Sequence, residues 1–353
     1  MEKQLQQLEN GLSKLQNKGS KFYFLTQDTE GNAMASVETN YRYVKHLIDA
    51  GYDAYVLYEK VEYKGVESWL GTDYSELPHS NIESGDLKVG PQDFVIVPEL
   101  YGNTLEQLMS MPCTKIVLSQ SHDYILDSLN PGFGWSNYGV TKCITTTDEQ
   151  KKYIASIFPS IQTEVISPVI SDYFVPSEKP KKPIISVHTR DQRMTMKIIK
   201  MFYLQNPQFK WLTFRDMRGM SKEEFAKVLG ESCLSVWVDR ISSFGTYPLE
   251  SMRCGTPVIG VLPTMKPEWL TKDNGIWSQD ETTIVTTIAN FVKNWLEDSL
   301  PEELYKSMGT ASNTYTIDKE RESVITYFET LTTEKVAEFE ASINKLKPAE
   351  ENV

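Results

Sequence analysis

One short polar segment, Ser242–Gly260, combines a tight loop, a helix start and a carboxylate. Gly245 permits a sharp turn, and Pro248 is typical of the first turn of a helix that Gly255 ends. An apolar run typical of a strand precedes the loop, so the loop leads from the carboxyl end of a strand into the amino end of a helix, where free amides suit a phosphate. Glu250, one turn into the helix, could accept hydrogen bonds from paired hydroxyls such as those of a ribose. The segment therefore predicts a nucleotide-binding loop.

The elements around this loop alternate between strands and helices. From Lys21 onward, β-branched or aromatic runs are followed by segments of helical period, and the alternation restarts after residues 171–183, a linker rich in proline and lysine. Such alternation implies parallel sheets covered by helices on both faces. The pattern Ser221-x-x-Glu224 predicts a helix start, and the apolar spacing over 318–345 predicts a long C-terminal helix. We expect an α/β protein of two units.

Several common ligand motifs are absent from the sequence. No G-x-G-x-x-G follows a strand and no G-x-x-x-x-G-K-[ST] occurs, which argues against dinucleotide and P-loop sites. None of the four histidines pairs with a cysteine at ligand spacing, which argues against zinc. No Asp-x-Asp occurs, so the usual carboxylate pair for a metal-bound diphosphate is missing. We predict no metal and no cofactor, and protein groups that neutralise any bound phosphates.

Composition limits the partners. The 353 residues include 48 Asp+Glu and 36 Lys+Arg, a formal net charge of −12, which disfavours nucleic acid unless a local basic groove exists. No apolar run is long enough to span a membrane, and the polar amino end lacks the apolar core of a signal peptide. The four cysteines are far apart and mostly in apolar segments, as buried thiols of a reducing compartment are. We expect a cytoplasmic protein without a membrane span.

The spacing of Phe244, Gly245, Glu250, Gly255 and Pro257–Ile259 matches a known pattern. It resembles the donor-binding signature of retaining GT-B glycosyltransferases of the family-4 type, E-x-F-G-x-x-x-x-E followed by a small-residue helix and G-x-P-V-I. The resemblance implies GT-B architecture, in which two Rossmann-like domains face a cleft, with a long C-terminal helix. It also implies metal-independent transfer of a sugar, with retention, from a nucleotide-sugar to an acceptor hydroxyl. Among nucleotide-sugars, we expect a UDP-linked donor.

The resemblance also assigns donor-binding roles. Glu250 matches the carboxylate that binds the donor ribose, and residues 242–246 match the loop against the donor sugar and diphosphate. Arg190 and Lys197 resemble the pair of basic residues that contacts the diphosphate in this family, and Arg193 is an alternative to Lys197. Such a pair neutralises the charge of a leaving diphosphate. The donor-binding residues so predicted are Arg190, Arg193, Lys197, Ser242, Ser243, Phe244, Gly245, Thr246 and Glu250.

Two further positions resemble functional residues of the N-terminal domain. His122 stands where the family often carries a histidine near the donor sugar and is the catalytic candidate, and Gly31 resembles one glycine of the acceptor loop. Each of these residues also has a simpler explanation. His122 could be a strand-end histidine hydrogen-bonded to its neighbour Asp123, and Gly31 could be an ordinary turn residue. Glu250 could be a first-turn acid that complements the helix dipole. The first glutamate of the signature is Ser242 here, so the alternative function is a nucleotide-sugar-binding module without turnover.

We predict three parts of the chain. Residues 1–170 form the acceptor-side Rossmann-like domain, 171–316 the donor-side Rossmann-like domain, and 317–353 a C-terminal helix that crosses back to the first domain. The acceptor stays open among a glycan, a lipid, a protein, a small molecule and a modified DNA base. A sugar-phosphate isomerase or epimerase of the same shape is a third hypothesis, which the loop signature disfavours.

Overall fold

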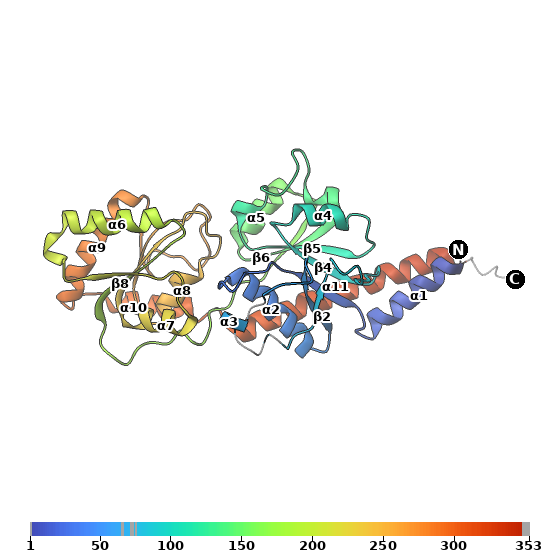
Figure 1. Cartoon of the computed structure of the whole chain (residues 1–353), viewed down its shortest axis with the longest axis horizontal. Coiled ribbons are helices and arrows are strands. Elements are labelled where there is room, and N and C mark those ends of the chain that lie inside the picture. Colours follow the sequence, from blue (N-terminus) through green and yellow to red (C-terminus); the bar gives the residue numbers. More distant parts are fainter. Residues whose placement is uncertain (1, 65–66, 71–73, 75, 348–353) are drawn as a thin grey trace.

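A computed structural model shows two α/β lobes followed by a long helix (Figure 1). The structure describes residues 2–64, 67–70, 74 and 76–347. Each lobe is built on one parallel sheet, because a strand that is followed by a covering helix re-enters the sheet in the same direction. The predicted α/β class and the long C-terminal helix are confirmed.

The first lobe holds a seven-stranded sheet, counted over the described residues, in the order β3-β2-β1-β4-β5-β6-β7. All neighbouring strands pair in parallel, so their carboxyl ends lie at one edge of the sheet. The strands are β1 (Lys21–Leu25), β2 (Asp53–Tyr58), β3 (His79–Asn81), β4 (Phe94–Pro98), β5 (Thr114–Ser119), β6 (Val140–Thr145) and β7 (Gln162–Val165).

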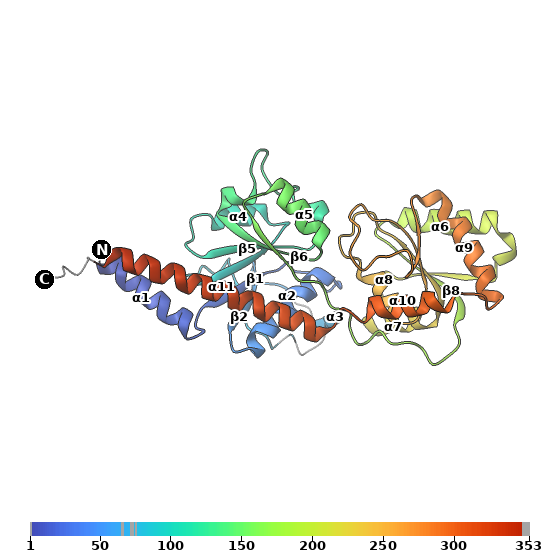
Figure 2. The same cartoon turned by 180° about the vertical axis from the view of Figure 1, so that it is seen from behind.

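Helices cover both faces of this sheet (Figure 1, Figure 2). One apolar cluster joins the sheet to α2 (Ala35–Asp49) and α11 (Ile317–Leu346), and another joins its other face to α4 (Gly102–Leu108) and α5 (Asp148–Ile157). The other elements of the lobe are α1 (Glu2–Gln16), α3 (Glu67–Leu70) and the 3-10 turns η2 (His122–Tyr124) and η3 (Trp135–Tyr138).

The second lobe repeats the arrangement with a five-stranded parallel sheet in the order β12-β11-β10-β8-β9. Its strands are β8 (Lys182–Thr189), β9 (Thr213–Asp216), β10 (Ser232–Val238), β11 (Val258–Val261) and β12 (Ile276–Ser278). One face carries α6 (Gln192–Gln205) and α9 (Glu281–Leu296), the other carries α7 (Lys222–Glu231), α8 (Thr246–Arg253) and α10 (Glu302–Ser312), and η4 (Pro207–Phe209) follows α6. The Ser221 hydroxyl oxygen accepts a hydrogen bond from the backbone N–H of Glu224 at 3.2 Å, which confirms the predicted helix start.

The last helix, α11, runs from the second lobe back along the first and continues beyond it beside α1 (Figure 1). The ring of Phe328 meets the ring of Phe22 edge-on, 5.3 Å between centroids. Buried Glu320 accepts hydrogen bonds from Arg42 Nε at 2.8 Å and lies 3.2 Å from His46 Nε2. Apolar packing and a buried ion pair therefore fix α11 on α2 and the first sheet.

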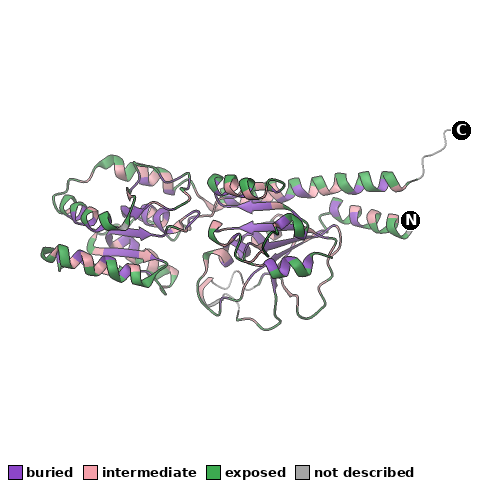
Figure 3. Cartoon of the chain, turned by 90° about the horizontal axis from the view of Figure 1, so that it is seen from above, coloured by how far each residue is buried: buried purple, intermediate pink, exposed green. Residues whose placement is uncertain are grey.

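Burial is concentrated in the strands of both lobes, while the outer faces of the helices are exposed (Figure 3). The four cysteines are free and buried, as the sequence predicts: Cys113, Cys143, Cys233 and Cys254. Among the described helices, none combines the length and the apolar character that crossing a membrane would need.

Candidate functional site

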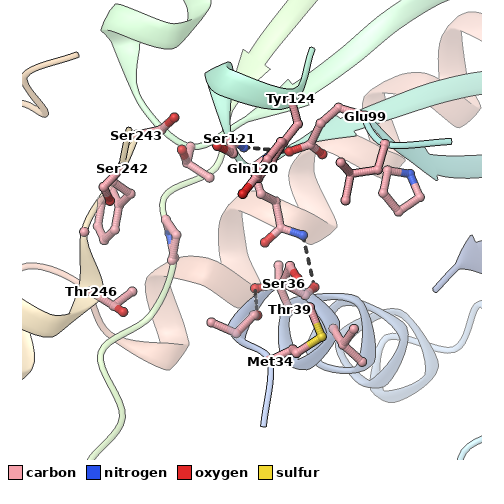
Figure 4. A pocket seen from close by; sticks show the side chains of 18 of the residues that line it. Met34, Ser36, Thr39, Glu99, Gln120, Ser121, Tyr124, Ser242, Ser243 and Thr246 are labelled. Carbon is pink, nitrogen blue, oxygen red and sulfur yellow. Dashed lines mark hydrogen bonds between the residues drawn. The ribbon is translucent and has the colours of Figure 1, made fainter. Parts of the chain in front are cut away.

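A cavity of about 560 Å³ lies where the carboxyl ends of the two sheets face each other. Residues after β1, β4, β5, β6 and β7 line one side together with the start of α2, and we call this side the N-terminal wall (lining residues between 26 and 168). Loops after β8 and β10 line the C-terminal wall (lining residues between 188 and 247), and Figure 4 shows the two sides facing each other. The crevice outside the carboxyl ends of the strands is where open α/β sheets bind ligands.

The loop before α8 forms much of the C-terminal wall. Gly245 has a φ of 74°, in the left-handed region, and a Cβ there would lie 2.8 Å from the Trp237 ring, so both conformation and space require glycine. Trp269 Nε1 donates to the carbonyl oxygen of Phe244 at 2.7 Å and holds the loop from behind. Gly245 is also the N-cap of α8 and brings no side-chain cap, so the first helix amides are available to an anion.

Of the three basic candidates, only Arg190 lines the cavity. Its Nε donates to Asp239 Oδ2 at 2.8 Å, and its Nη1 donates to the Tyr124 hydroxyl of the first lobe at 3.2 Å. Arg193 and Lys197 are exposed on α6 and lie outside the lining. The structure thus places one paired cation in the cleft and ties it to both lobes.

Glu250 lies on α8 just behind the cavity lining and is half-buried. Burial raises its pKa to about 8; nearby Lys222 opposes this shift, and Glu38 of the first lobe reinforces it. Lys222 Nζ lies 2.9 Å from Glu38 Oε1, so this lysine joins the lobes beside the carboxylate. Sequence reasoning missed Lys222, although its place directly after the Ser221 cap marks it as part of a helix start.

His122 and Ser243 meet across the cleft. The backbone N–H of His122 donates to Ser243 Oγ at 2.9 Å, and its Nδ1 lies 2.9 Å from the same oxygen. Burial lowers the pKa of His122, an effect that Asp123 opposes, so the ring is neutral at pH 7. Ser243 belongs to the cavity lining and His122 lies just behind it. The contact brings the catalytic candidate to the predicted donor loop.

Ser242, at the position of the first signature glutamate, is buried and lines the cavity. Two charged residues come shortly before it in the chain. Asp239 is paired with Arg190, and Arg240 donates to the carbonyl oxygen of Gln279 at 2.9 Å. A hydroxyl therefore stands where the family pattern has a carboxylate.

The N-terminal wall contains a buried carboxyl group that sequence reasoning missed. Glu99 Oε1 accepts the backbone N–H groups of Gln120 at 3.0 Å and Ser121 at 2.7 Å (Figure 4). Burial raises the pKa of Glu99 to about 7. Gln120 Nε2 in turn donates to the carbonyl oxygen of Ser36, the start of α2, at 3.0 Å. A polar residue directly after the apolar run of β4 is the one sequence signal that points to Glu99.

Gly31 lies in the loop between β1 and α2 with a φ of 82°. It is exposed and outside the lining, whereas Thr26, Gln27 and Met34 of the same loop line the cavity. Gln27 Nε2 points back to Met34 Sδ, 2.8 Å away. The loop contributes to the N-terminal wall through its two ends.

No family model matches the chain. It is 26% identical over 186 residues to an alpha-1,6-glucosyltransferase of Actinobacillus pleuropneumoniae serotype 7; the match covers 50% of this chain and 54% of the relative, about half the relative's length. A sucrose-phosphate synthase from Thermosynechococcus elongatus has a TM-score of 0.64 at 13% identity over 89% of this chain and 99% of that chain. Anabaena HepE, solved in complex with UDP-glucose, has a TM-score of 0.59 at 10% identity over 88% of this chain and 99% of that chain.

These likenesses define the class of fold. The solved structures share the fold of this chain over most of its length. The chain has the GT-B fold of glycosyltransferases, as its loop signature predicts, and the relative that its sequence matches is a glycosyltransferase.

Proposed function

We propose that this protein is a glycosyltransferase that moves a sugar from a UDP-linked donor to an acceptor hydroxyl, with retention and without a metal. The observation that carries the proposal is the Gly245 loop, which leads into α8 at a cavity between the carboxyl ends of two sheets. In this proposal residues 1–170 form the acceptor side and 171–316 the donor side. The third predicted part, 317–353, contains α11 (Ile317–Leu346), which joins the donor side to the acceptor side, and its residues 348–353 lie outside the described residues.

The proposed donor lies on the C-terminal wall. Glu250 accepts the ribose hydroxyls, while the amides that follow Gly245 and the guanidinium of Arg190 contact the diphosphate. Phe244 and the serines before it are placed against the sugar. Arg193 and Lys197 remain the two proposed second cations, and both would have to reach the phosphates from the exposed side of α6.

The proposed chemistry is electrostatic. The bond between the anomeric carbon and the diphosphate breaks with its electron pair on the diphosphate, where Arg190 and the α8 amides stabilise the growing charge. The acceptor oxygen bonds the anomeric carbon on the same face, and its proton passes to a departing phosphate oxygen. His122, held against Ser243, is placed to contact the donor sugar, and Gly31 is the proposed acceptor contact at the edge of the N-terminal wall.

The names of the similar proteins favour glucose as the transferred sugar. The sequence relative is an alpha-1,6-glucosyltransferase, and HepE was solved with UDP-glucose. UDP-glucose is therefore the first donor to test.

A nucleotide-sugar-binding module without turnover is the second candidate function. The buried hydroxyl of Ser242 is the observation that favours it, because the family pattern has a glutamate there that contacts hydroxyls of the donor sugar. Both candidates predict nucleotide binding, and only the first predicts release or transfer of the sugar.

A thermal-shift series tests the proposal. Wild type, Glu250→Ala and the exposed-site control Glu340→Ala are each mixed with UDP, GDP, ADP, TDP and their sugar conjugates, and NMR then follows slow hydrolysis of any conjugate that stabilises the protein. We expect UDP and UDP-glucose to stabilise wild type and the control but not Glu250→Ala, with slow release of glucose. Binding without release or transfer supports the module, and no binding of any nucleotide overturns the donor site.

A further inference from the structure

The two walls of the cavity differ in charge. The C-terminal wall carries the Arg190–Asp239 ion pair. On the N-terminal wall, no lysine or arginine lines the cavity in the described part of the chain, and Glu99 is its one carboxyl group. The amino end of α2 is part of this wall, and its first turn carries Glu38, which pairs with Arg42 at 3.2 Å and with Lys222 at 2.9 Å.

Glu99 presents one carboxyl oxygen that its surroundings leave unused. The backbone N–H groups of Gln120 and Ser121 both donate to Oε1, and the N–H of Glu99 itself also stabilises the carboxyl group, whereas no side chain of the described residues donates to Oε2. Glu99 is only 4% exposed, yet it lines the cavity. Because Glu99 lines the cavity, the hydroxyl of a ligand can donate to Oε2 and replace the water that this oxygen otherwise bonds.

The groups around Glu99 are those that bind an uncharged sugar. Gln27, Thr39 and Ser121 supply neutral donors and acceptors, and Tyr101 supplies a ring with a polar end. Arg190 reaches the Tyr124 hydroxyl of this wall from the opposite side, but it is already paired with Asp239. A phosphate or carboxylate beside Glu99 would therefore lose water and lie next to a carboxyl group, which is costly.

We propose that the N-terminal wall binds an uncharged polyhydroxylated sugar as acceptor, with an acceptor hydroxyl donating to Glu99 Oε2. The proposal rests on the proposed function and deepens it by choosing a neutral carbohydrate over anionic acceptors. It follows from the uncharged lining and from the one carboxyl oxygen that the fold leaves open.

A competition between acceptors tests this choice. The full chain is given UDP-glucose with isomaltose, methyl β-glucoside, glucose 6-phosphate or glucuronate, and NMR measures transfer to each sugar and saturation-transfer binding in the presence of UDP. We expect the neutral sugars to exceed the anionic ones at least tenfold in kcat/KM. Equal or better use of an anionic sugar, or failure of both neutral sugars to bind or accept glucose while UDP binds, overturns the proposal. Failure of UDP to bind instead overturns the proposed function.

Two pairs of variants sharpen the test. Glu99→Gln keeps an oxygen for the Gln120 and Ser121 amides but replaces Oε2 by a donor, so the acceptor KM should rise about tenfold while the Kd for UDP is unchanged. If the Kd for UDP rises together with the acceptor KM, Glu99 acts only by holding the loop at Gln120 and Ser121 and does not contact the acceptor. Ala35→Lys, at the exposed start of α2 on the same wall, should improve use of glucose 6-phosphate, and Ala35→Gln is its uncharged control.

Discussion

The two walls of the cleft are built on similar sheets but achieve their chemistry differently. Most of the C-terminal wall is one segment, in which Gly245, the amino end of α8 and Glu250 follow one another within six residues of sequence, and the loop after β8 adds the cation Arg190. The N-terminal wall is assembled from the ends of five strands and the start of α2, and among its lining residues only Glu99 has an ionisable carboxyl group. The difference teaches that a charged diphosphate is recognised by backbone N–H groups gathered at one helix start, whereas a neutral ligand can be bound by hydroxyl and amide side chains from separate segments.

The largest effect is expected at the carboxylate of the C-terminal wall. Glu250→Ala should weaken UDP binding roughly 100-fold, because two ribose hydroxyls lose hydrogen bonds to its carboxyl group at about 1.5 kcal/mol each. Isothermal titration with UDP measures it, and Glu340→Ala on α11 serves as control. A Kd within a factor of two of wild type would remove Glu250 from the donor site.

Arg190→Ala should lower kcat about 10- to 100-fold, because a charge-assisted contact to the leaving diphosphate is worth about 1.5–3 kcal/mol. Asp239 is also left unpaired in the cleft. Initial rates with UDP-glucose measure the effect, with Lys200→Ala on α6 as the matched loss of an exposed positive charge. If Arg193→Ala or Lys197→Ala costs more than Arg190→Ala, the diphosphate lies nearer to α6 than proposed.

Gly245→Ala should weaken donor binding about tenfold and lower stability by about 1–3 kcal/mol, because it adds a Cβ at positive φ against the Trp237 ring. Gly219→Ala is the matched control, since Gly219 has a φ of 72° with nothing within 4 Å of the added atom. Chemical denaturation and UDP titration of both variants separate backbone strain from the clash. Equal losses in the two variants would show that the space beside Trp237 does not matter.

Ser243→Ala should lower kcat a few-fold and leave UDP affinity nearly unchanged, because it removes the hydroxyl that joins His122 to the donor loop. Steady-state rates with UDP-glucose measure it, with Ser342→Ala on α11 as control. Full activity of Ser243→Ala would show that the contact between His122 and Ser243 is not needed for catalysis.

The smallest expected effect is on the pH dependence of stability without ligand. The pKa of Glu250 is raised to about 8, so between about pH 5 and pH 8 the folded state binds more protons than the unfolded state, and the free energy of unfolding falls as pH rises. Glu99, with a pKa of about 7, acts in the same direction. Glu250→Gln should therefore melt a few degrees above wild type at pH 8 and show a flatter pH profile. Thermal denaturation across this range checks it, and an unchanged slope would contradict the raised pKa.

Prediction from sequence succeeded where the signal is local. The alternation of strands and helices predicts the two parallel sheets, the Ser221 cap predicts the start of α7, and the apolar spacing predicts α11. Donor roles for Arg190 and the Gly245 loop remain predictions, although the structure brings both to one cavity. Glu99 and Lys222 escaped sequence reasoning because no motif assigns either a role, Lys222 being an unspecified position of the Ser221 cap pattern, and because their partners lie elsewhere in the chain.

The sequence by itself determined the class of fold and the position of one loop, because periodicity, caps and a glycine at positive φ act over a few residues. Only the tertiary structure decided what faces that loop. The contact between His122 and Ser243 joins positions 121 residues apart, and Lys222 meets Glu38 over 184. The raised pKa values of Glu99 and Glu250 likewise follow from burial between lobes, which no short stretch of sequence encodes.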